Sequence, residues 1–392
     1  MGRPEFTGWI DHTSSAPASL RSLPVSAAPQ SVTEIVALAG ALVEASAPGR
    51  VAVGQPTTLG GSRRSLVIRL SIDGHPRFTS VVVKRSLAAD GFRRERAGLL
   101  LLARLFGERP VAPRILAEDP GRRLLVLEDL GATGTVADLL ISAAVPGSVA
   151  EDAVVDLFSV YGRVNAVARD AAAELDRLGG ADHAIPAMGG DYLSERPLER
   201  LAELLRPLGV EVSAAAAREA EMLRSSRWIS FSTGDACPDN AVVTPAGVRV
   251  CDLELCGFRN ALLDGAACHL AFPACWCNLA LAPALRSRVD AAYRAELIGA
   301  FPQVADDAVY AAQMLRACAT WAIVATGWLL PNALATDPPL DPRQPESGRR
   351  SILGRLETFA AMAFQAGRLL AIAELASTLA SRLRELWGEP VA

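Results

Sequence analysis

The pattern of apolar and polar positions changes its period once along the chain. In the first third, short β-branched or alternating runs are separated by glycine-rich turns, and Asp73-Gly74 is a hairpin signal between two of them. These runs predict strands at residues 51–61, 64–73 and 78–86 and two more within 114–131. Apolar residues spaced three and four apart predict helices at 31–46, where Ser31 and Glu34 form a capping box, and at 91–108.

Beyond residue 131 helical periodicity dominates. It predicts helices at residues 148–175, 193–210 and 213–226, and again after residue 265, with a Pro- and Asp-rich loop at 331–350. The expected fold is α+β and bilobal. A tail at residues 1–30, predicted to be disordered, precedes a small antiparallel-sheet lobe with one inserted helix at 31–130 and a larger, mostly helical lobe at 131–392.

Composition narrows the function. The 392 residues carry 39 basic and 43 acidic side chains, for a net charge of −4, and show no basic stripe, which argues against a nucleic-acid partner. The apolar stretch 317–336 contains Pro331 and predicts a buried helix of about a dozen residues rather than a membrane span. No signal peptide is recognisable, and seven cysteines, an odd number, favour reduced, mostly buried thiols. We therefore expect a cytoplasmic protein without a membrane partner; its oligomeric state is not predicted.

Lysine occurs once, at Lys84, and the other basic residues are all arginine. Coding bias toward arginine explains the general preference. It does not explain why the remaining lysine ends a β-branched run, where a strand holds it rigidly. A compact ammonium differs from a guanidinium where a point charge must fit among phosphate oxygens. Lys84 is therefore a candidate functional residue.

Four oxygen-bearing side chains gather within residues 232–257, namely Asp235, Asn240, Asp252 and Glu254. Such residues are common turn formers. The apolar runs on both sides, however, predict buried strand ends, where carboxylates are costly without a cation. A magnesium ion prefers oxygen ligands and few carboxylates, which this set supplies. A second metal hypothesis, Cys275 and Cys277 with His269, matches no common zinc spacing.

Taken in order, these features resemble the aminoglycoside phosphotransferase and choline kinase group, small-molecule relatives of the protein kinases. The resemblance covers roughly residues 35–270. It implies that Lys84 binds the ATP phosphates and that Glu95, on the following helix, orients its ammonium. The resemblance also implies a nucleotide-covering loop and a hinge strand whose backbone binds adenine. The residues implied for these two elements are Gly60, Gly61 and Ser62, and Glu128, Asp129 and Leu130.

The family's catalytic loop reads His-Gly-Asp, four variable residues, then Asn, and this chain reads TGDACPDN from Thr233 to Asn240. The resemblance implies that Asp235 accepts or orients the proton of the substrate hydroxyl, while Asn240 and Asp252 bind Mg²⁺. Glu254 would assist as a supporting or second-metal group. Thr233 replaces the family's histidine, which keeps a catalytically silent variant open.

Outside the catalytic set, Asp264 and Arg259 are expected to brace the catalytic loop. Residues 265–392 carry eleven acidic and eleven basic side chains and several tryptophans. This balance favours a neutral or partly apolar hydroxylated molecule over a polycation as phosphate acceptor, and we expect a sugar, an amino alcohol or a natural product with a free hydroxyl. Two alternatives remain: a silent ATP-binding regulatory module on the same fold, and a nucleotidyl (AMP) transferase.

Overall fold

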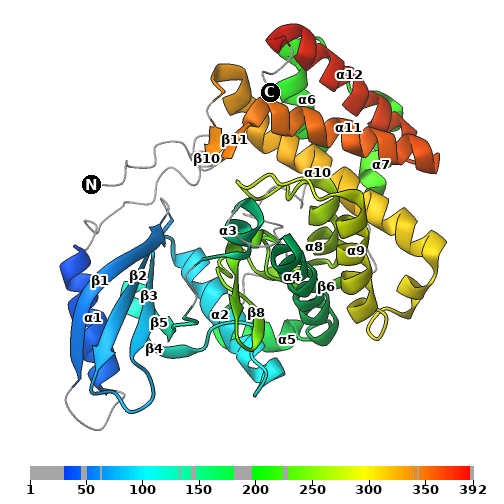
Figure 1. Ribbon diagram of the computed structural model, residues 1–392. Coiled ribbons are helices and arrows are strands. Elements are labelled where there is room, and N and C mark those ends of the chain that lie inside the picture. The colour runs from blue at the N-terminus through cyan, green and yellow to red at the C-terminus, as the bar shows by residue number, and fades with distance from the viewer. Residues whose placement is uncertain are drawn as a thin grey trace.

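The computed structural model describes residues 31–45, 51–61, 64–131, 134–142, 147–180, 197–223, 228–337, 339–341 and 344–388. The tail predicted at residues 1–30 lies outside them. The chain forms two lobes, one built on a sheet and one mostly helical, as the sequence predicts (Figure 1).

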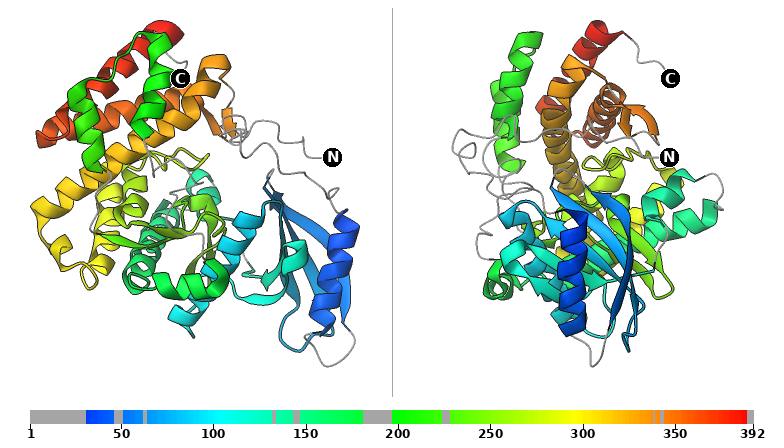
Figure 2. Two further views of the ribbon diagram at one scale, coloured as in Figure 1. Left: turned by 180° about the vertical axis from the view of Figure 1, so that it is seen from behind. Right: turned by 90° about the vertical axis from the view of Figure 1, so that its left-hand side faces the viewer.

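The first lobe is an antiparallel five-stranded sheet with one helix on each face. Its strand order is β1-β2-β3-β5-β4. The strands are β1 (Ala52–Gly61), β2 (Ser65–Asp73), β3 (Ser80–Ser86), β4 (Ile115–Asp119) and β5 (Leu124–Glu128). Helix α1 (Val32–Ala45) covers the outer face, and α2 (Ala89–Phe106) lies between the sheet and the second lobe (Figures 1 and 2). The hairpin predicted at Asp73-Gly74 joins β2 to β3.

Strand β3 lies in the middle of the sheet and is buried on both faces, which explains its β-branched run. Because successive side chains of a strand point to opposite faces, Val81 and Val83 pack under α1 while Val82 and Lys84 face the second lobe. Lys84 pairs in register with Val67 on one side and Leu125 on the other. The sheet thus fixes the backbone of the single lysine from both sides.

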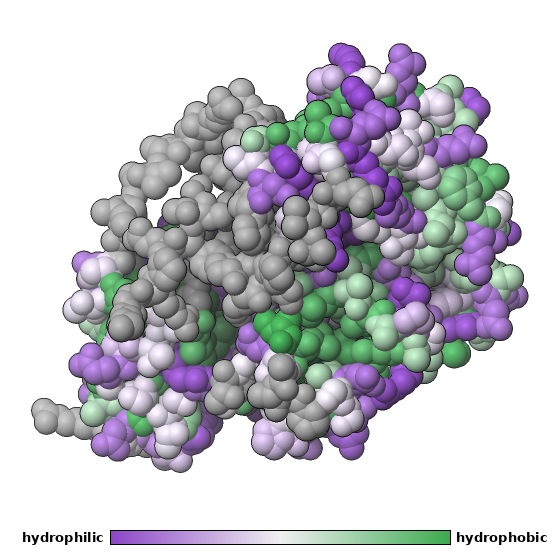
Figure 3. Space-filling model, turned by 45° about the horizontal axis from the view of Figure 1, so that its top comes forward, coloured by the Kyte–Doolittle hydropathy of each residue, from purple (hydrophilic) through white to green (hydrophobic). Residues whose placement is uncertain are grey.

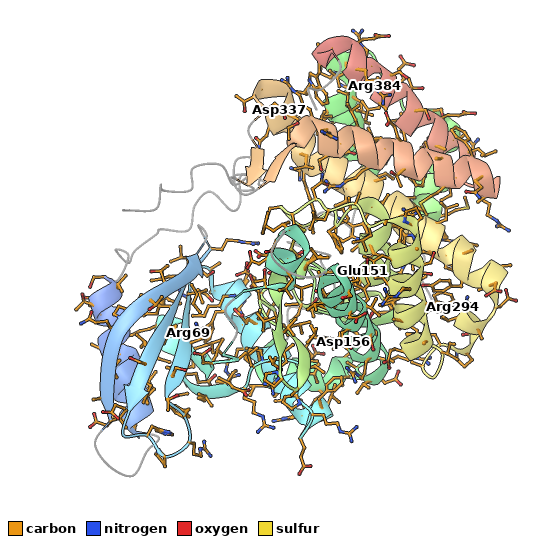
Figure 4. The ribbon with its side chains drawn as sticks, viewed as in Figure 1. Arg69, Glu151, Asp156, Arg294, Asp337 and Arg384 are labelled. Atoms are coloured by element: carbon orange, nitrogen blue, oxygen red, sulfur yellow. A yellow bond between two sulfur atoms is a disulfide. The ribbon has the colours of Figure 1, made fainter. Side chains whose placement is uncertain are left out.

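The second lobe surrounds two small antiparallel pairs with helices. The pairs are β6 (Ile229–Ser232) with β9 (Gly257–Asn260) and β7 (Ala241–Thr244) with β8 (Gly247–Val250). The longer helices are α3 (Val136–Ile141), α4 (Gly147–Val167), α6 (Pro197–Leu205), α7 (Ala214–Leu223), α9 (Pro283–Leu297), α10 (Asp307–Ala335), α11 (Gly348–Ala366) and α12 (Leu370–Trp387). Two single turns are α5 (Ala172–Leu175) and α8 (Leu262–Ala266). Arg288 of α9 pairs with Glu151 of α4, and Figure 4 labels Glu151.

Helix α10 is longer than the sequence predicts, since it runs for 29 residues and continues through Pro331 to Ala335. By length and composition it could span a membrane, but 61% of its apolar window is buried inside the protein, as in a core helix. Most of the expected 331–350 loop is regular too. After α10 come the short strands β10 (Pro339–Asp341) and β11 (Gln344–Ser347), which pair, and α11 starts at Gly348.

Candidate active site

Two loops leave the same end of the β6–β9 pair. The predicted catalytic loop, residues 233–240, follows β6 at Ser232, and the segment containing Asp252 precedes β9 at Gly257, in register with Ser232. A backbone hydrogen bond from Cys251 to the carbonyl oxygen of Asn240 (2.8 Å) joins the two loops further out. Strand pairing therefore places residues that are distant in the sequence beside one another.

Lys84 reaches across from the sheet lobe to this end. Its ammonium Nζ lies 2.8 Å from Glu95 Oε2 and 2.7 Å from Asp252 Oδ1. Burial by itself would lower the pKa of Lys84, but Asp252, Glu95 and Glu254 together raise it above its ordinary value. Lys84 thus stays an ammonium and links α2 of the first lobe to the candidate metal ligand of the second.

The pKa values of Glu95 and Asp252, which share the ammonium of Lys84, shift in opposite directions. Burial raises the pKa of Glu95 to about 7 although Lys84 acts in the opposite direction. Burial also acts to raise the pKa of Asp252, but its bond to Lys84 prevails and the net pKa is lowered. Asp252 adopts a left-handed backbone conformation (φ 60°), which aspartate tolerates better than most residues. Of the two carboxyl groups that bond Lys84, Asp252 is the one whose charged form the site favours.

Asp235 sits in the same group and is half-buried. Burial, followed by the charge of Asp252, raises its pKa to about 7. Within the described part of the structure, its buried oxygen Oδ1 has no hydrogen-bond partner. The backbone oxygen of Asp235 accepts a long bond from the Asn240 side-chain amide (3.5 Å). An acceptor of this kind suits a group that takes up a proton.

Oxygen atoms of Asn240 and Asp252 fit the donor chemistry of Mg²⁺, and the ammonium of Lys84 already places a cation against Asp252. Glu254 is arranged differently from the expectation. It bonds Arg64, which follows the nucleotide-covering loop (Nε to Oε1, 3.0 Å), and its side chain lies against Gly91 of α2. Glu254 therefore ties that loop to the second lobe.

The predicted loop and hinge residues are placed in part. Gly60 and Gly61 end β1, and Ser62 lies outside the described residues. At the hinge, the Glu128 N–H donates to Arg114 O (2.9 Å) and its carboxylate accepts from Arg249, so its N–H bonds within the protein rather than facing a ligand. The next two residues, Asp129 and Leu130, begin the connection to the second lobe.

Asp129 also anchors that connection through its side chain. Its carboxylate accepts hydrogen bonds from Arg69 of β2 (Figure 4) and from the Gly131 N–H, each at 2.9 Å. The hinge is thereby tied to the sheet.

The catalytic loop rests on a buried polar network that sequence reasoning found only in part. Asp264 accepts from Ser232 Oγ (2.7 Å) and Asn165 Nδ2 (3.0 Å). Ser232 Oγ in turn accepts from the Gly234 N–H (3.0 Å), and Tyr293 donates to Asn165 (2.6 Å). The bracing expected of Asp264 thus involves three further residues on β6, α4 and α9, which no local sequence signal marks.

Arg259 and Thr233 flank this network. The buried Arg259 donates to Leu255 O (2.7 Å), and burial lowers its pKa while Asp264 opposes the shift. Thr233 is 2% exposed, and in the described structure its hydroxyl oxygen has no hydrogen-bond partner. The position of the family's histidine is therefore filled by a packed side chain that adds no visible bond to the loop.

The expectation of reduced thiols is wrong for one pair, because Cys237 of the catalytic loop forms a disulfide with Cys275. The metal hypothesis based on His269 also changes: His269 pairs with Asp290 (3.0 Å), and the third sulfur near Cys275 and Cys277 belongs to Cys237. A cross-link over 38 residues depends on the tertiary fold and is invisible to local patterns.

Comparison with known proteins finds similarity at the level of solved structures. No family model and no curated protein matches the chain. Among solved structures it is similar to a choline/ethanolamine kinase family protein from Mesorhizobium loti, with 17% identity over 82% of this chain and 93% of that chain and a TM-score of 0.48. A choline kinase from Cryptosporidium parvum is 12% identical over 90% of this chain and 94% of that chain, with a TM-score of 0.46. An amicoumacin kinase in complex with AMP-PNP and Ca²⁺ is 11% identical over 83% of this chain and 88% of that chain, with a TM-score of 0.43. All three are small-molecule kinases, the group that the sequence motifs resemble.

Proposed function

We propose that this chain is an ATP- and Mg²⁺-dependent phosphotransferase that moves the γ-phosphoryl group to a hydroxyl of a small molecule. The observation that supports it best is the position of Lys84. The only lysine of the chain reaches from the sheet lobe to Asp252 in the helical lobe, 168 residues further on. Phosphoryl transfer needs little covalent work by the protein beyond positioning and neutralising charge.

The chain's own residues then have separate tasks. Lys84, held by Glu95, binds phosphate oxygens, and its bond to Asp252 is exchanged when that carboxylate takes a metal. Asn240 and Asp252 would hold Mg²⁺, which would supply neutralisation of the phosphate charge. Asp235 accepts the proton of the acceptor hydroxyl as the oxygen of that hydroxyl bonds to the γ-phosphorus and the bond to the leaving ADP oxygen breaks. Arg64 and Glu254 hold the covering loop over the nucleotide.

The acceptor in this proposal is not a polycation: it is a neutral sugar, an amino alcohol or a natural product. The support is the equal number of acidic and basic residues between positions 265 and 392. A polycationic acceptor would call for an acidic excess. Turnover of a hydroxyl-compound panel only with polycationic aminoglycosides would contradict this choice.

Nucleotide binding and turnover test the assignment separately. Lys84→Met and Asp252→Asn are expected to abolish the rise in Tm that ATP with Mg²⁺ produces, because each removes a nucleotide contact. Asp235→Asn is expected to keep that rise and to lower kcat by about 10²-fold or more, the usual scale for a general base. Arg93→Met, at an exposed position on α2, is the matched control and should change neither.

Product mass distinguishes the alternatives. Transfer of one phosphate supports the kinase, and gain of AMP identifies a nucleotidyl transferase. ATP binding without any product identifies a silent module, for which the packed Thr233 is the motivating observation. Full activity of the Asp235 variant would overturn the role given to that carboxylate.

A further inference from the structure

Three cysteine sulfurs lie close together, and one of them belongs to the catalytic loop. Cys237 lies between Asp235 and Asn240 in the sequence, and Cys275 and Cys277 come from the segment before α9. Cys237 and Cys275 form the disulfide, and the Sγ of Cys277 lies 2.9 Å from that of Cys275. The three sulfurs all lie within 4.8 Å of one another, and none of the three residues is more than 5% exposed.

Backbone N–H donors and one guanidinium group lie near these sulfurs. The Asp239 N–H donates to Cys237 Sγ (3.4 Å). Burial raises the pKa of Cys277, and the charges of Asp239 and Asp235 add to this rise. The Leu279 N–H and the Arg355 guanidinium oppose the rise without reversing it. Arg355 is 3% exposed and is held by Leu270 O (3.2 Å), among other contacts. N–H donors aimed at sulfur are typical of the shell around metal-bound thiolates.

The two segments that carry the sulfurs are also fixed to each other independently. Between the two cysteines of the turn, Trp276 donates its indole N–H to Asp239 Oδ2 (2.7 Å). The other oxygen of Asp239 accepts from Thr135 (3.1 Å). Opening the disulfide therefore leaves the three sulfurs facing one another.

We infer that the reduced chain binds one thiophilic d¹⁰ metal ion, of the Zn²⁺ or Cu⁺ type, through Cys237, Cys275 and Cys277. Buried thiolates need a cation, and soft sulfur ligands select such ions over magnesium. Around an ion with bonds of about 2.3 Å, the sulfurs lie roughly 3.8 Å apart, which small side-chain rotations reach once the disulfide is open. The site is separate from the oxygen donors Asn240 and Asp252 and cross-links the same two segments as the disulfide.

The site is populated in two steps. A phosphine reductant takes the oxygen of one water, and the two disulfide sulfurs gain its two hydrogens as thiols. Metal binding then displaces the three thiol protons to solvent as three metal–sulfur bonds form.

Cadmium alone serves as the probe, because Cd²⁺–thiolate bonds absorb in the ultraviolet. Full-length chain is reduced, freed of reductant without oxygen and titrated with Cd²⁺. The thiolate absorbance is expected to saturate at one Cd²⁺ per chain and to be reversed by Zn²⁺. Cys277→Ser should lose it, whereas the control Cys318→Ser, buried in α10, should keep it. Absence of the band, or an equal band in Cys277→Ser, overturns the inference.

If Cys277→Ser does not fold, the wild-type zinc form decides. X-ray absorption at the zinc edge should count three sulfur neighbours at about 2.3 Å, and fewer than three would refute the site. Neither measurement involves nucleotide, so the metal site and the proposed kinase activity fail or succeed independently.

Discussion

At the scale of single residues, Asp235 illustrates how placement changes chemistry. An exposed aspartate has a pKa near 3.9, but burial and the neighbouring Asp252 raise the pKa of Asp235 to about 7. The folded chain therefore holds a proton that the unfolded chain releases between about pH 4 and 7. The associated stability is present below pH 4 and is lost as the pH rises through 7.

Asp235→Asn removes the loss of stability at high pH, because the amide does not ionise. The variant is expected to be more stable than the wild type at pH 8, by about 1–2 kcal/mol in the free energy of unfolding, with a smaller difference at pH 5. Thermal unfolding without nucleotide at both pH values measures this. A gain of the same size at both pH values would show that charge is not the cause.

The activity of the wild type has the opposite pH dependence. Asp235 accepts a proton only when it is ionised, so kcat is expected to fall as the pH decreases below an apparent pKa at or below 7. Bound magnesium shifts that pKa downward, since a cation favours the carboxylate. A pH–rate profile between pH 5 and 9 measures it; a rate that is flat down to pH 5 in the full complex would remove Asp235 as the base.

Residue-level features were predictable where they are local in sequence. Lys84 directly follows the β-branched run that marks it. The oxygen donors around the β7–β8 hairpin lie within a few residues of the apolar runs that mark them. Asn165, Ser232 and Tyr293 were missed because their significance comes only from contacts across more than thirty residues. Cys237 gave no sign of its distant partner for the same reason.

At the scale of elements, the turn after β6 depends on one glycine. Gly234 has φ +92°, and a Cβ at this position would lie 2.0 Å from the carbonyl oxygen of Leu255. The catalytic loop and the loop carrying Asp252 can approach this closely only because no side chain intervenes. Strand boundaries within this region follow from the β6–β9 pairing, which the sequence pattern did not indicate.

Gly234→Ala is therefore expected to displace one loop or the other. We expect kcat to fall by at least about 10²-fold and the free energy of unfolding to fall by about 2 kcal/mol or more. Gly299→Ala is the control, because nothing lies within 4 Å of its added Cβ. Kinetics and chemical denaturation of both variants measure the difference, and wild-type kcat in Gly234→Ala would contradict the role of this turn.

At the scale of the whole molecule, the two lobes share one hydrophobic core along α2, and polar contacts join them at several points. Lys84 bonds Asp252, Arg249 of β8 bonds Glu128 at the end of β5 (2.9 Å), and the Val250 N–H donates to Val111 O (2.8 Å). Gly98 of α2 also faces Cys256 at close range. Figure 3 shows apolar side chains gathered near the centre of one face and polar ones spread toward its edges. The two-lobe order was predictable from the change of hydrophobic period, and the resemblance implied that Lys84 and Asp252 share one site, whereas the contacts of Arg249 and Val250 were not predictable.

The ion pair of Arg249 with Glu128 tests that junction. Both groups are partly exposed, so Arg249→Ala should lower the free energy of unfolding by less than about 1 kcal/mol. Because the pair fixes the end of the hinge strand, KM for ATP is expected to rise several-fold with kcat little changed. Arg249→Lys should restore part of the affinity, and an unchanged KM in Arg249→Ala would separate the pair from nucleotide binding.

The single lysine has a practical consequence. Apart from the amino terminus, the chain offers acylating reagents one amine, and that amine is 4% exposed behind two carboxylates. The rate at which Lys84 is acylated therefore measures how often the two lobes separate, without any introduced probe.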